Sequence, residues 1–331
     1  MSVVSATWPG GAATPQRIGK AMDVILHIGA HRCASTSFQH YLRRNSDKLA
    51  GNGIGFWGPR YTRKGLFRGL TSEAKTDTRG TANRRGIGRV RLNLSQCEQR
   101  YRTLMVSDEN VLGSMRENLR SGKLYPNAAN RMTRFLPAFD GYVRDVVLNI
   151  RSPETYWASV LGYVLMRGGP VPDPDVLDRI ARSRRGWREV VKDIADAVPG
   201  TRLRILPFEV FAGRPDRQLA AFSPGIPPHR HARSWVNQTP LLPKLRARAQ
   251  AEQAACLPEG DGRWQPFSRE QISMLREQYA DDVMWLIAGA DGLASMIDTF
   301  TKKEPGLSRP ATEQTRGRPN DHQERRMEGA G

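Results

Sequence analysis

One stretch near the start of the chain constrains the fold more than any other: an apolar run, a short polar loop and an amphipathic segment follow one another directly. Residues Asp23–Gly29 (DVILHIG) have the pattern of a buried β-strand that ends at a glycine. Residues Ser35–Leu49 carry Phe38, Tyr41 and Leu42 at helical spacing, which predicts a helix with one apolar face. A strand that leads into a helix through a tight loop is typical of α/β proteins.

The same alternation continues along the chain. Further strands are predicted at Ile54–Trp57, Leu104–Val106, Val143–Ile150 and Leu203–Pro207, and further helices at Pro153–Arg167 and near 215–222, 240–255 and 268–288. The sequence therefore predicts an α/β fold whose central, mainly parallel sheet is flanked by helices. In such sheets ligands lie beyond the carboxyl ends of the strands, so the residues that follow each strand are the candidates for a site.

Charge is the feature of the composition that points to a class of ligand. The chain has 331 residues, with 51 Lys and Arg against 33 Asp and Glu, a net charge of +18. This excess favours an anionic ligand or partner: nucleic acid, a membrane surface, a nucleotide or an acidic polymer. Three scattered cysteines, no secretory signal in the first twenty residues and no apolar stretch of membrane-spanning length favour a cytoplasmic protein without a membrane span.

The chain is expected to form one folded domain over residues 22–300. Residues 1–21 are rich in Gly, Ala, Thr and Pro, and residues 301–331 are charged with almost nothing apolar, so both are expected to be disordered. Within the domain, residues 60–91 hold ten basic side chains and few large apolar ones. This segment is expected to be a basic, flexible insertion, either a flap beside the first loop or an ordinary solvated loop.

The loop after the first strand, residues 29–37 (GAHRCASTS), has the composition of an anion site. Backbone N–H groups and the dipole of the following helix attract an anion, and the hydroxyl groups add donors. Compared with the GxxxxGK[ST] loop of nucleotide-binding proteins, Gly29 matches, but Ala34 and Ser35 replace the second glycine and the lysine. The strong cation is Arg32. An ordinary strand–helix turn is the alternative.

Two other predicted strands are followed by charged side chains. Arg151 comes directly after Val143–Ile150, with Ser159 about two helical turns later, and an arginine at this edge can clamp a phosphate. Glu109, in Ser-Asp-Glu-Asn after Leu104–Val106, can accept a proton from a nucleophile or hold a metal ion. The alternatives are a surface arginine and a plain helix N-cap.

These segments together resemble bacterial sulfotransferases that use 3′-phosphoadenosine 5′-phosphosulfate (PAPS). The stretch 27–39 (HIGAHRCASTSFQ) is similar to the HxGxHKTGTTSLQ loop of that family. Residues 107–110 are similar to its Ser-x-Glu segment and residues 151–168 to its 3′-phosphate segment, while 203–211 and 267–286 resemble its late strand and final helix. The resemblance is patchy but in order over 23–287, and it implies a three-layer, P-loop-like fold.

The resemblance implies a metal-free transfer of a sulfuryl group from PAPS to a hydroxyl or amine acceptor. It assigns the phosphosulfate to loop residues His31, Arg32, Cys33, Ala34, Ser35, Thr36 and Ser37, and the 3′-phosphate to Arg151 and Ser159. Arg32 stands where the family has a lysine that supports the leaving phosphate, and Glu109 is the candidate general base. Cys33 and Ala34 replace a threonine and a glycine, so a slow enzyme stays an alternative to an active one.

Two other functions fit parts of the sequence. A P-loop kinase or NTPase shares the first strand, loop and helix, but the chain lacks the loop lysine and an Asp-ended Walker-B strand. A nucleic-acid-binding protein fits the charge, but the arginines are not interleaved with aromatic residues, so no nucleic-acid partner is predicted. His229 and His231 have no neighbouring Cys or carboxylate in sequence, so no metal is predicted either. Carbohydrate hydroxyls are the family's commonest bacterial acceptors, and the surplus charge favours an anionic acceptor.

Overall fold

Six parallel strands form a single sheet in the order β2-β3-β1-β4-β5-β6. Their bounds are β1 Asp23–His27, β2 Ile54–Trp57, β3 Thr103–Ser107, β4 Val143–Ile150, β5 Arg202–Pro207 and β6 Ser295–Met296. This computed structural model describes residues 22–71, 80–223 and 225–297, and the predicted extensions 1–21 and 301–331 lie outside that range. The α/β prediction is confirmed, and five of the strands were predicted within two residues of their ends.

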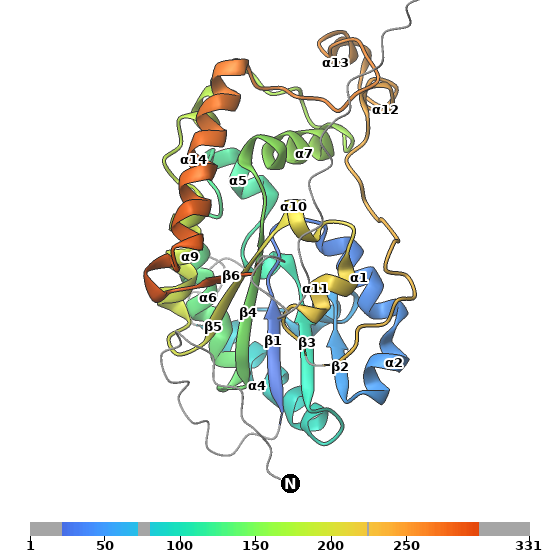
Figure 1. The fold of residues 1–331 in the computed structure, drawn as a ribbon, viewed down its shortest axis with the longest axis vertical. Coiled ribbons are helices and arrows are strands. Elements are labelled where there is room, and N and C mark those ends of the chain that lie inside the picture. The colour runs from blue at the N-terminus through green and yellow to red at the C-terminus, as the bar shows by residue number, and fades with distance from the viewer. Residues whose placement is uncertain (1–21, 72–79, 224, 298–331) are drawn as a thin grey trace, which may run out of the picture. The chain divides into compact units, whose positions relative to one another are not determined.

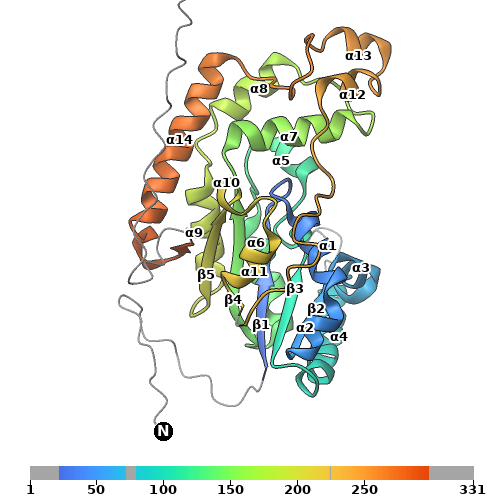
Figure 2. The same ribbon diagram turned by 45° about the vertical axis from the view of Figure 1, so that its right-hand side comes forward.

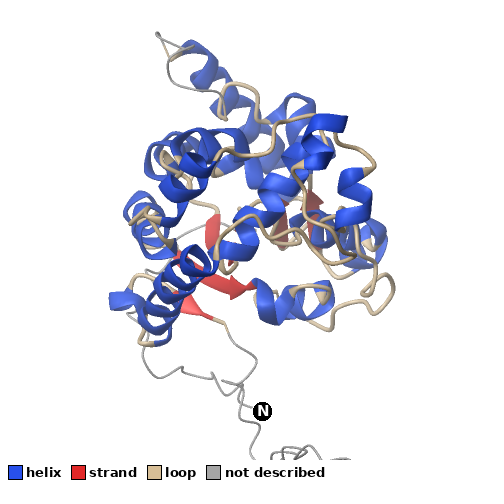
Figure 3. Cartoon of the chain, turned by 90° about the horizontal axis from the view of Figure 1, so that it is seen from above, coloured by secondary structure: helices blue, strands red, loops and turns tan. Residues whose placement is uncertain are grey.

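Helices cover both faces of the sheet (Figures 1 and 3). The longer ones are α1 Ser35–Arg44, α4 Thr81–Glu98, α6 Ala128–Phe135, α7 Pro153–Leu165, α8 Pro174–Ala181, α9 Trp187–Ala197 and α14 Arg269–Ile287. The shorter ones are α2 Ser46–Gly51, α3 Pro59–Tyr61, η1 Thr62–Leu66, η3 Glu109–Val111, α5 Met115–Ser121, η4 Leu136–Phe139, α10 Phe208–Phe211, α11 Pro215–Ala220, α12 Leu242–Arg246, α13 Ala251–Ala255 and η5 Ala290–Gly292. In Figures 1 and 2, α7 crosses above the upper edge of the sheet.

Two hydrophobic cores lie on opposite faces of the sheet, and β1 contributes to both. Val24 and Leu26 belong to the larger core, which includes side chains of α4, α6, α7 and α9. Ile25 belongs to the smaller core with Phe38 and Leu42 of α1. Successive side chains of a strand point to opposite faces, so an unbroken apolar run such as β1 requires helices on both sides. The result is three layers, consistent with a P-loop-like fold.

The strand order places three loops at one edge of the sheet. β1 lies between β3 and β4 and pairs in parallel with both. The chain runs from β1 outward to β2, returns to β3 and then crosses to β4 on the other side of β1. Such a reversal of strand order opens a crevice at the carboxyl ends of the strands. The segments after β1, β3 and β4, each singled out in the sequence, therefore meet there.

Two predicted helices are each divided in the structure. The segment Ser35–Leu49 forms α1 and α2, which are separated at Asn45. The Asn45 side-chain amide donates to the backbone oxygens of Tyr41 and Arg230, both at 2.9 Å. An asparagine that bonds backbone groups competes with the helix at this point. The segment 240–255 likewise forms two short helices, α12 and α13.

The basic segment 60–91 contributes to the core, contrary to its expected character as a loop with few core residues. Leu66, Phe67 and Leu70 are each at most 6% exposed. Residues 81–91 form the first part of α4, and residues 72–79 lie outside the described range. The core contribution of this segment was not predicted from the sequence because its apolar residues are few and are separated by charged ones.

No helix in the described residues is both long enough and apolar enough to cross a bilayer.

Candidate functional site

The loop after β1 folds back on itself through three residues in the left-handed region. Gly29, Arg32 and Ala34 have φ angles of 56°, 61° and 63°. The backbone N–H of His31 donates to the Tyr125 hydroxyl at 2.7 Å, and the Cys33 side chain is buried in the larger core. A non-glycine residue is strained in this region, and such strain is concentrated at functional sites. Buried contacts on both sides hold this loop in place.

The loop leads into α1 without a conventional cap. Within the described residues, no side chain accepts a hydrogen bond from the first turn of α1, and that turn contains no acidic residue. The first N–H groups of a helix need acceptors, and their dipoles favour a negative charge. Ser35 and Thr36 begin the helix and line the pocket above it. This helix start has the properties of an anion site.

Two arginines converge on this pocket without a carboxylate partner. Arg32 donates from Nε to the Ser159 hydroxyl at 2.9 Å and from Nη2 to the Thr239 hydroxyl at 3.2 Å. Arg151 is 5% exposed and donates to the Arg32 backbone oxygen and the Thr155 hydroxyl, both at 2.9 Å. Neither forms an ion pair with any acidic side chain of the described range.

Burial, followed by the charge of Arg151, lowers the pKa of Arg32, and burial also lowers the pKa of Arg151. Both directions mean that the folded protein holds these cations at a cost. A buried charge is ordinarily paired, since an unpaired one loses solvation without compensation. A bound anion between Arg32 and Arg151 would supply the missing pairing.

Eight of the ten predicted site residues line this one pocket. They are His31, Arg32, Ala34, Ser35, Thr36, Glu109, Arg151 and Ser159. Cys33 and Ser37 do not line it. Burial raises the pKa of the Cys33 thiol to about 12, so the thiol is a packing group. The Ser37 hydroxyl instead bonds the backbone of Val236. The pattern of the sequence gave no sign that these two side chains point away from the pocket.

The Glu109 carboxylate lines the pocket and accepts hydrogen bonds from two side chains. Its Oε1 accepts from Arg63 Nη2 at 2.9 Å, and its Oε2 accepts from Gln39 Nε2 at 2.7 Å. Burial alone would raise the pKa of Glu109, but Arg63, His31 and Gln39 outweigh it and lower the pKa to about 2. The carboxylate is therefore ionised at neutral pH and is a weak base while Arg63 stays in contact.

Arg63 also contacts the neighbouring carboxylate of Asp108, with Nη2 to Oδ1 at 2.7 Å and Nε to Oδ1 at 3.1 Å. The Thr62 hydroxyl donates to the same carboxylate at 2.5 Å, and Asp108 caps η3 by accepting from Asn110 N at 3.1 Å. The helix-cap alternative thus describes Asp108, while Glu109 faces the pocket. Because Asp108 keeps Arg63 in place, Arg63 can release Glu109 without losing its other partner.

A chain of buried hydrogen bonds supports Glu109 from below. Gln39 Nε2 donates to the Ser107 hydroxyl at 3.2 Å, and this hydroxyl lies 2.7 Å from His27 Nδ1. His27 Nε2 lies 2.7 Å from the Asn149 side-chain oxygen. Burial lowers the pKa of His27 to about 4, so the ring is neutral and donates from Nε2 to Asn149. This series of hydrogen bonds fixes the orientation of the Gln39 amide, which in turn holds the carboxylate of Glu109.

Residues 235–239 lie over the pocket as a strap. The Ser37 hydroxyl donates to the Val236 oxygen at 3.2 Å and accepts from the Val236 nitrogen at 2.9 Å. The Thr239 hydroxyl lies 2.6 Å from that of Ser159. The pocket beneath measures about 140 Å³, below the roughly 300 Å³ at which ligand pockets begin. This conformation has room for a small anion, and a larger ligand requires the strap to move.

Several residues that complete the site were not predicted from the sequence. Aromatic rings line the pocket beside the arginines: Tyr163 lies 5.1 Å from the Arg32 guanidinium, and Phe208 lies 4.2 Å from that of Arg151. Trp235 also lines it. Arg63 was counted only as one charge in a basic segment, and Trp235 and Thr239 come from a loop without a motif.

No family model, curated protein or solved structure matches this chain. Within the described residues, no three His, Cys, Asp or Glu side chains are grouped as metal ligands.

Proposed function

We propose that this protein transfers a sulfuryl group from PAPS to a hydroxyl or amine acceptor. The observation that carries the proposal is a pair of arginines, half-buried Arg32 and buried Arg151, which line one pocket with the uncapped start of α1 and have no acidic ion-pair partner in the described residues. Two cations and a helix start suit a ligand with more than one phosphate or sulfate group. Tyr163, Phe208 and Trp235 beside them suit a planar base.

The transfer would use the two sides of the pocket differently. The acceptor oxygen or nitrogen forms a bond to sulfur while the bond between sulfur and the 5′-phosphate oxygen breaks, and the acceptor loses its proton. Arg32 would stabilise the charge on the departing phosphate, as an arginine can without donating a proton to it. Glu109 would accept the acceptor's proton after Arg63 moves away from it.

The hydrogen bond from Arg32 to Ser159 qualifies the roles that the resemblance assigns. The resemblance assigns Arg32 to the sulfuryl end of the donor and Ser159 to the 3′-phosphate. In the structure, however, Arg32 Nε lies 2.9 Å from the Ser159 hydroxyl. For both to act on one donor, Arg32 must release Ser159 when the donor enters. The strap must then move as well, because Thr239 bonds to both of these side chains.

Transfer of labelled sulfate from PAPS to a panel of carbohydrate, lipid, peptide and small-molecule acceptors tests the proposal. We expect at least one sulfated product and a large loss of turnover in Glu109→Gln with little change in donor affinity. Phosphate transfer from ATP with no sulfate transfer from PAPS would instead favour a kinase-like protein. Unchanged turnover in Glu109→Gln would remove Glu109 from the role of base.

A further inference from the structure

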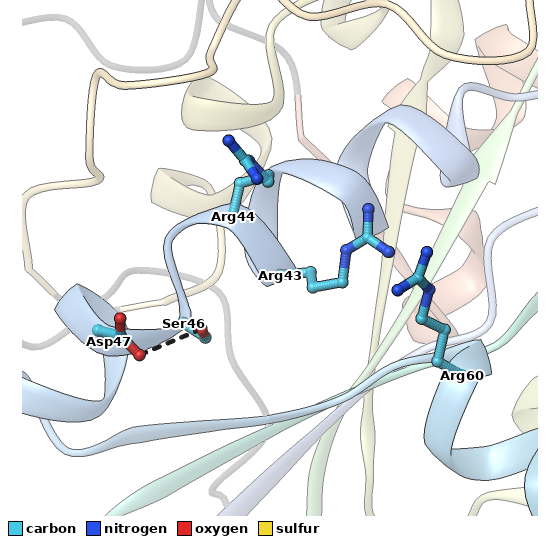
Figure 4. A pocket seen from close by; sticks show the side chains of 5 residues that line it. All are labelled: Arg43, Arg44, Ser46, Asp47 and Arg60. Carbon is cyan, nitrogen blue, oxygen red and sulfur yellow. Dashed lines mark hydrogen bonds between the residues drawn. The ribbon is translucent and has the colours of Figure 1, made fainter.

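A second group of arginines lies at the far end of α1 from the anion loop. Arg43, Arg44, Ser46, Asp47 and Arg60 line an open hollow of about 470 Å³, named here the α1–α3 hollow (Figure 4). This volume lies within the range of roughly 300–1,000 Å³ common to ligand sites. Arg43 and Arg60 come from different helices, yet their guanidinium groups point toward one another in Figure 4. Two like charges in this arrangement call for an anion between them.

The three arginines have no acidic partner within the described residues. None of Arg43, Arg44 and Arg60 forms an ion pair with an acidic side chain of that range. The acidic side chain in the lining, Asp47, accepts a hydrogen bond from the Ser46 hydroxyl at 3.4 Å. The hollow therefore has a net positive charge that nothing in the described chain neutralises.

Two histidines and an arginine border this positive surface. Arg43 Nη2 lies 3.2 Å from His40 Nδ1, and the rings of His40 and His231 lie 6.4 Å apart. Partial desolvation and the charges of Arg43 and Arg44 lower the pKa of His40, which shows how closely the cations are grouped. Asn45 holds the backbone of Arg230 against the end of α1 at 2.9 Å. The loop that carries Arg230 and His231 thus borders the hollow.

The lining indicates which anions fit. Its described lining residues include no aromatic ring, whereas surfaces that bind single-stranded nucleic acids combine cations with aromatic stacking platforms. It does contain a carboxylate, Asp47, which repels every anionic group alike but accepts hydrogen bonds from hydroxyl groups. A ligand that carries both anionic groups and many hydroxyl groups satisfies both parts of the lining. An acidic oligosaccharide has this chemistry.

We propose that the α1–α3 hollow binds an acidic oligosaccharide, with carboxylate or sulfate groups on Arg43, Arg44 and Arg60 and a hydroxyl group on Asp47. The ten residues of α1 separate the hollow from the anion loop by about 14 Å. Binding here is independent of the donor pocket. That the bound sugar chain is also the acceptor of sulfate rests on the proposed function.

Binding of a heparin hexasaccharide by titration calorimetry at physiological salt tests the site. The triple variant Arg43→Gln/Arg44→Gln/Arg60→Gln is expected to bind roughly 30-fold more weakly, at about 0.7 kcal/mol for each lost contact. The matched control, Arg120→Gln/Arg182→Gln/Arg269→Gln, removes three exposed charges from α5, the end of α8 and α14, and is expected to change binding by less than about threefold. Equal weakening in both variants would overturn the site, because it would show attraction to net charge alone.

A single-stranded DNA dodecamer distinguishes the other class of ligand. The hexasaccharide is expected to bind more tightly than the DNA, and Asp47→Asn is expected to reduce that preference. Tighter binding of the DNA, with the same loss in the triple variant, would overturn the proposal in favour of a nucleic-acid site. Because these measurements need neither donor nor turnover, their failure leaves the proposed transferase function standing, and the reverse also holds.

Discussion

Ala34 occupies a position that favours glycine. Its φ of 63° lies in the left-handed region, where a side chain costs roughly 1–2 kcal/mol, and the sulfotransferase loops that it resembles have glycine there. The cost is offset in part because glycine loses more chain entropy on folding.

We expect Ala34→Gly to stabilise the protein by about 0.5–1 kcal/mol, measured by chemical denaturation. The control Ala50→Gly, in the right-handed helix α2, is expected to destabilise it by a similar amount. Equal destabilisation in the two variants would show that the Ala34 backbone is not strained.

Arg63 sets the basicity of Glu109, and this has a consequence for the pH dependence of the rate. With the pKa of Glu109 at about 2, the carboxylate is ionised throughout the range above about pH 4, so the pH–rate profile of the proposed transfer should show no acidic limb from this group in the native protein. Removing Arg63 raises that pKa toward its ordinary value of 4.5 or above, because burial then acts with less opposition.

In Arg63→Gln, turnover should therefore fall as the pH drops below about 5, since protonated Glu109 cannot accept a proton. The pH–rate profiles of Arg63→Gln and of the exposed neighbour Lys64→Gln provide the comparison. Identical profiles in the two variants would contradict the coupling between Arg63 and Glu109.

Among the elements around the site, the strap 235–239 lines the pocket and is held to α1 by the side chain of Ser37. Ser37→Ala removes both hydrogen bonds to Val236, worth roughly 1–2 kcal/mol together. Trypsin should then cleave after Arg233 several times faster, and 3′,5′-ADP should alter the cleavage rate because the donor requires a displaced strap.

Ser46→Ala, an exposed serine outside the strap, is the matched control and should leave cleavage after Arg233 unchanged. If Ser37→Ala is cleaved no faster than the native chain, the Ser37 contacts do not hold the strap.

Strands and helices, which are formed by consecutive residues, could be predicted from the sequence. Contacts between residues far apart in the chain could not. Apolar periodicity located β1 and β4 because each is buried on both faces. The loop chemistry located Arg151 and Glu109 because strand ends of a parallel sheet share one edge. By contrast, β6 has two residues and carries no periodic signal, and the contact of Ser37 with Val236 joins positions 199 residues apart. Side-chain direction within the loop, which sends Cys33 into the core, also depends on packing that the sequence does not display.

For the whole molecule, whose net charge is +18, three groups of arginines in the described residues have distinct surroundings. Arg144, Arg202 and Arg204 surround the buried carboxylate of Asp145, with nitrogen–oxygen distances of 2.8–2.9 Å, and serve the fold. Arg32 and Arg151 line the candidate donor pocket. Arg43, Arg44 and Arg60 line the α1–α3 hollow. These eight arginines therefore form a structural cluster and two separate surfaces suited to anions.

We propose that Arg32 and Arg151 bind the phosphates of a 3′-phosphorylated adenine nucleotide. Titration calorimetry of 3′,5′-ADP, 5′-AMP and ATP against the native chain, Arg151→Gln and Arg182→Gln, an exposed control at the end of α8, tests this assignment. We expect 3′,5′-ADP to bind at least about tenfold more tightly than 5′-AMP or ATP, and Arg151→Gln alone to remove the difference. Binding of ATP as tight as that of 3′,5′-ADP, or a preference that survives in a folded Arg151→Gln protein, would contradict it.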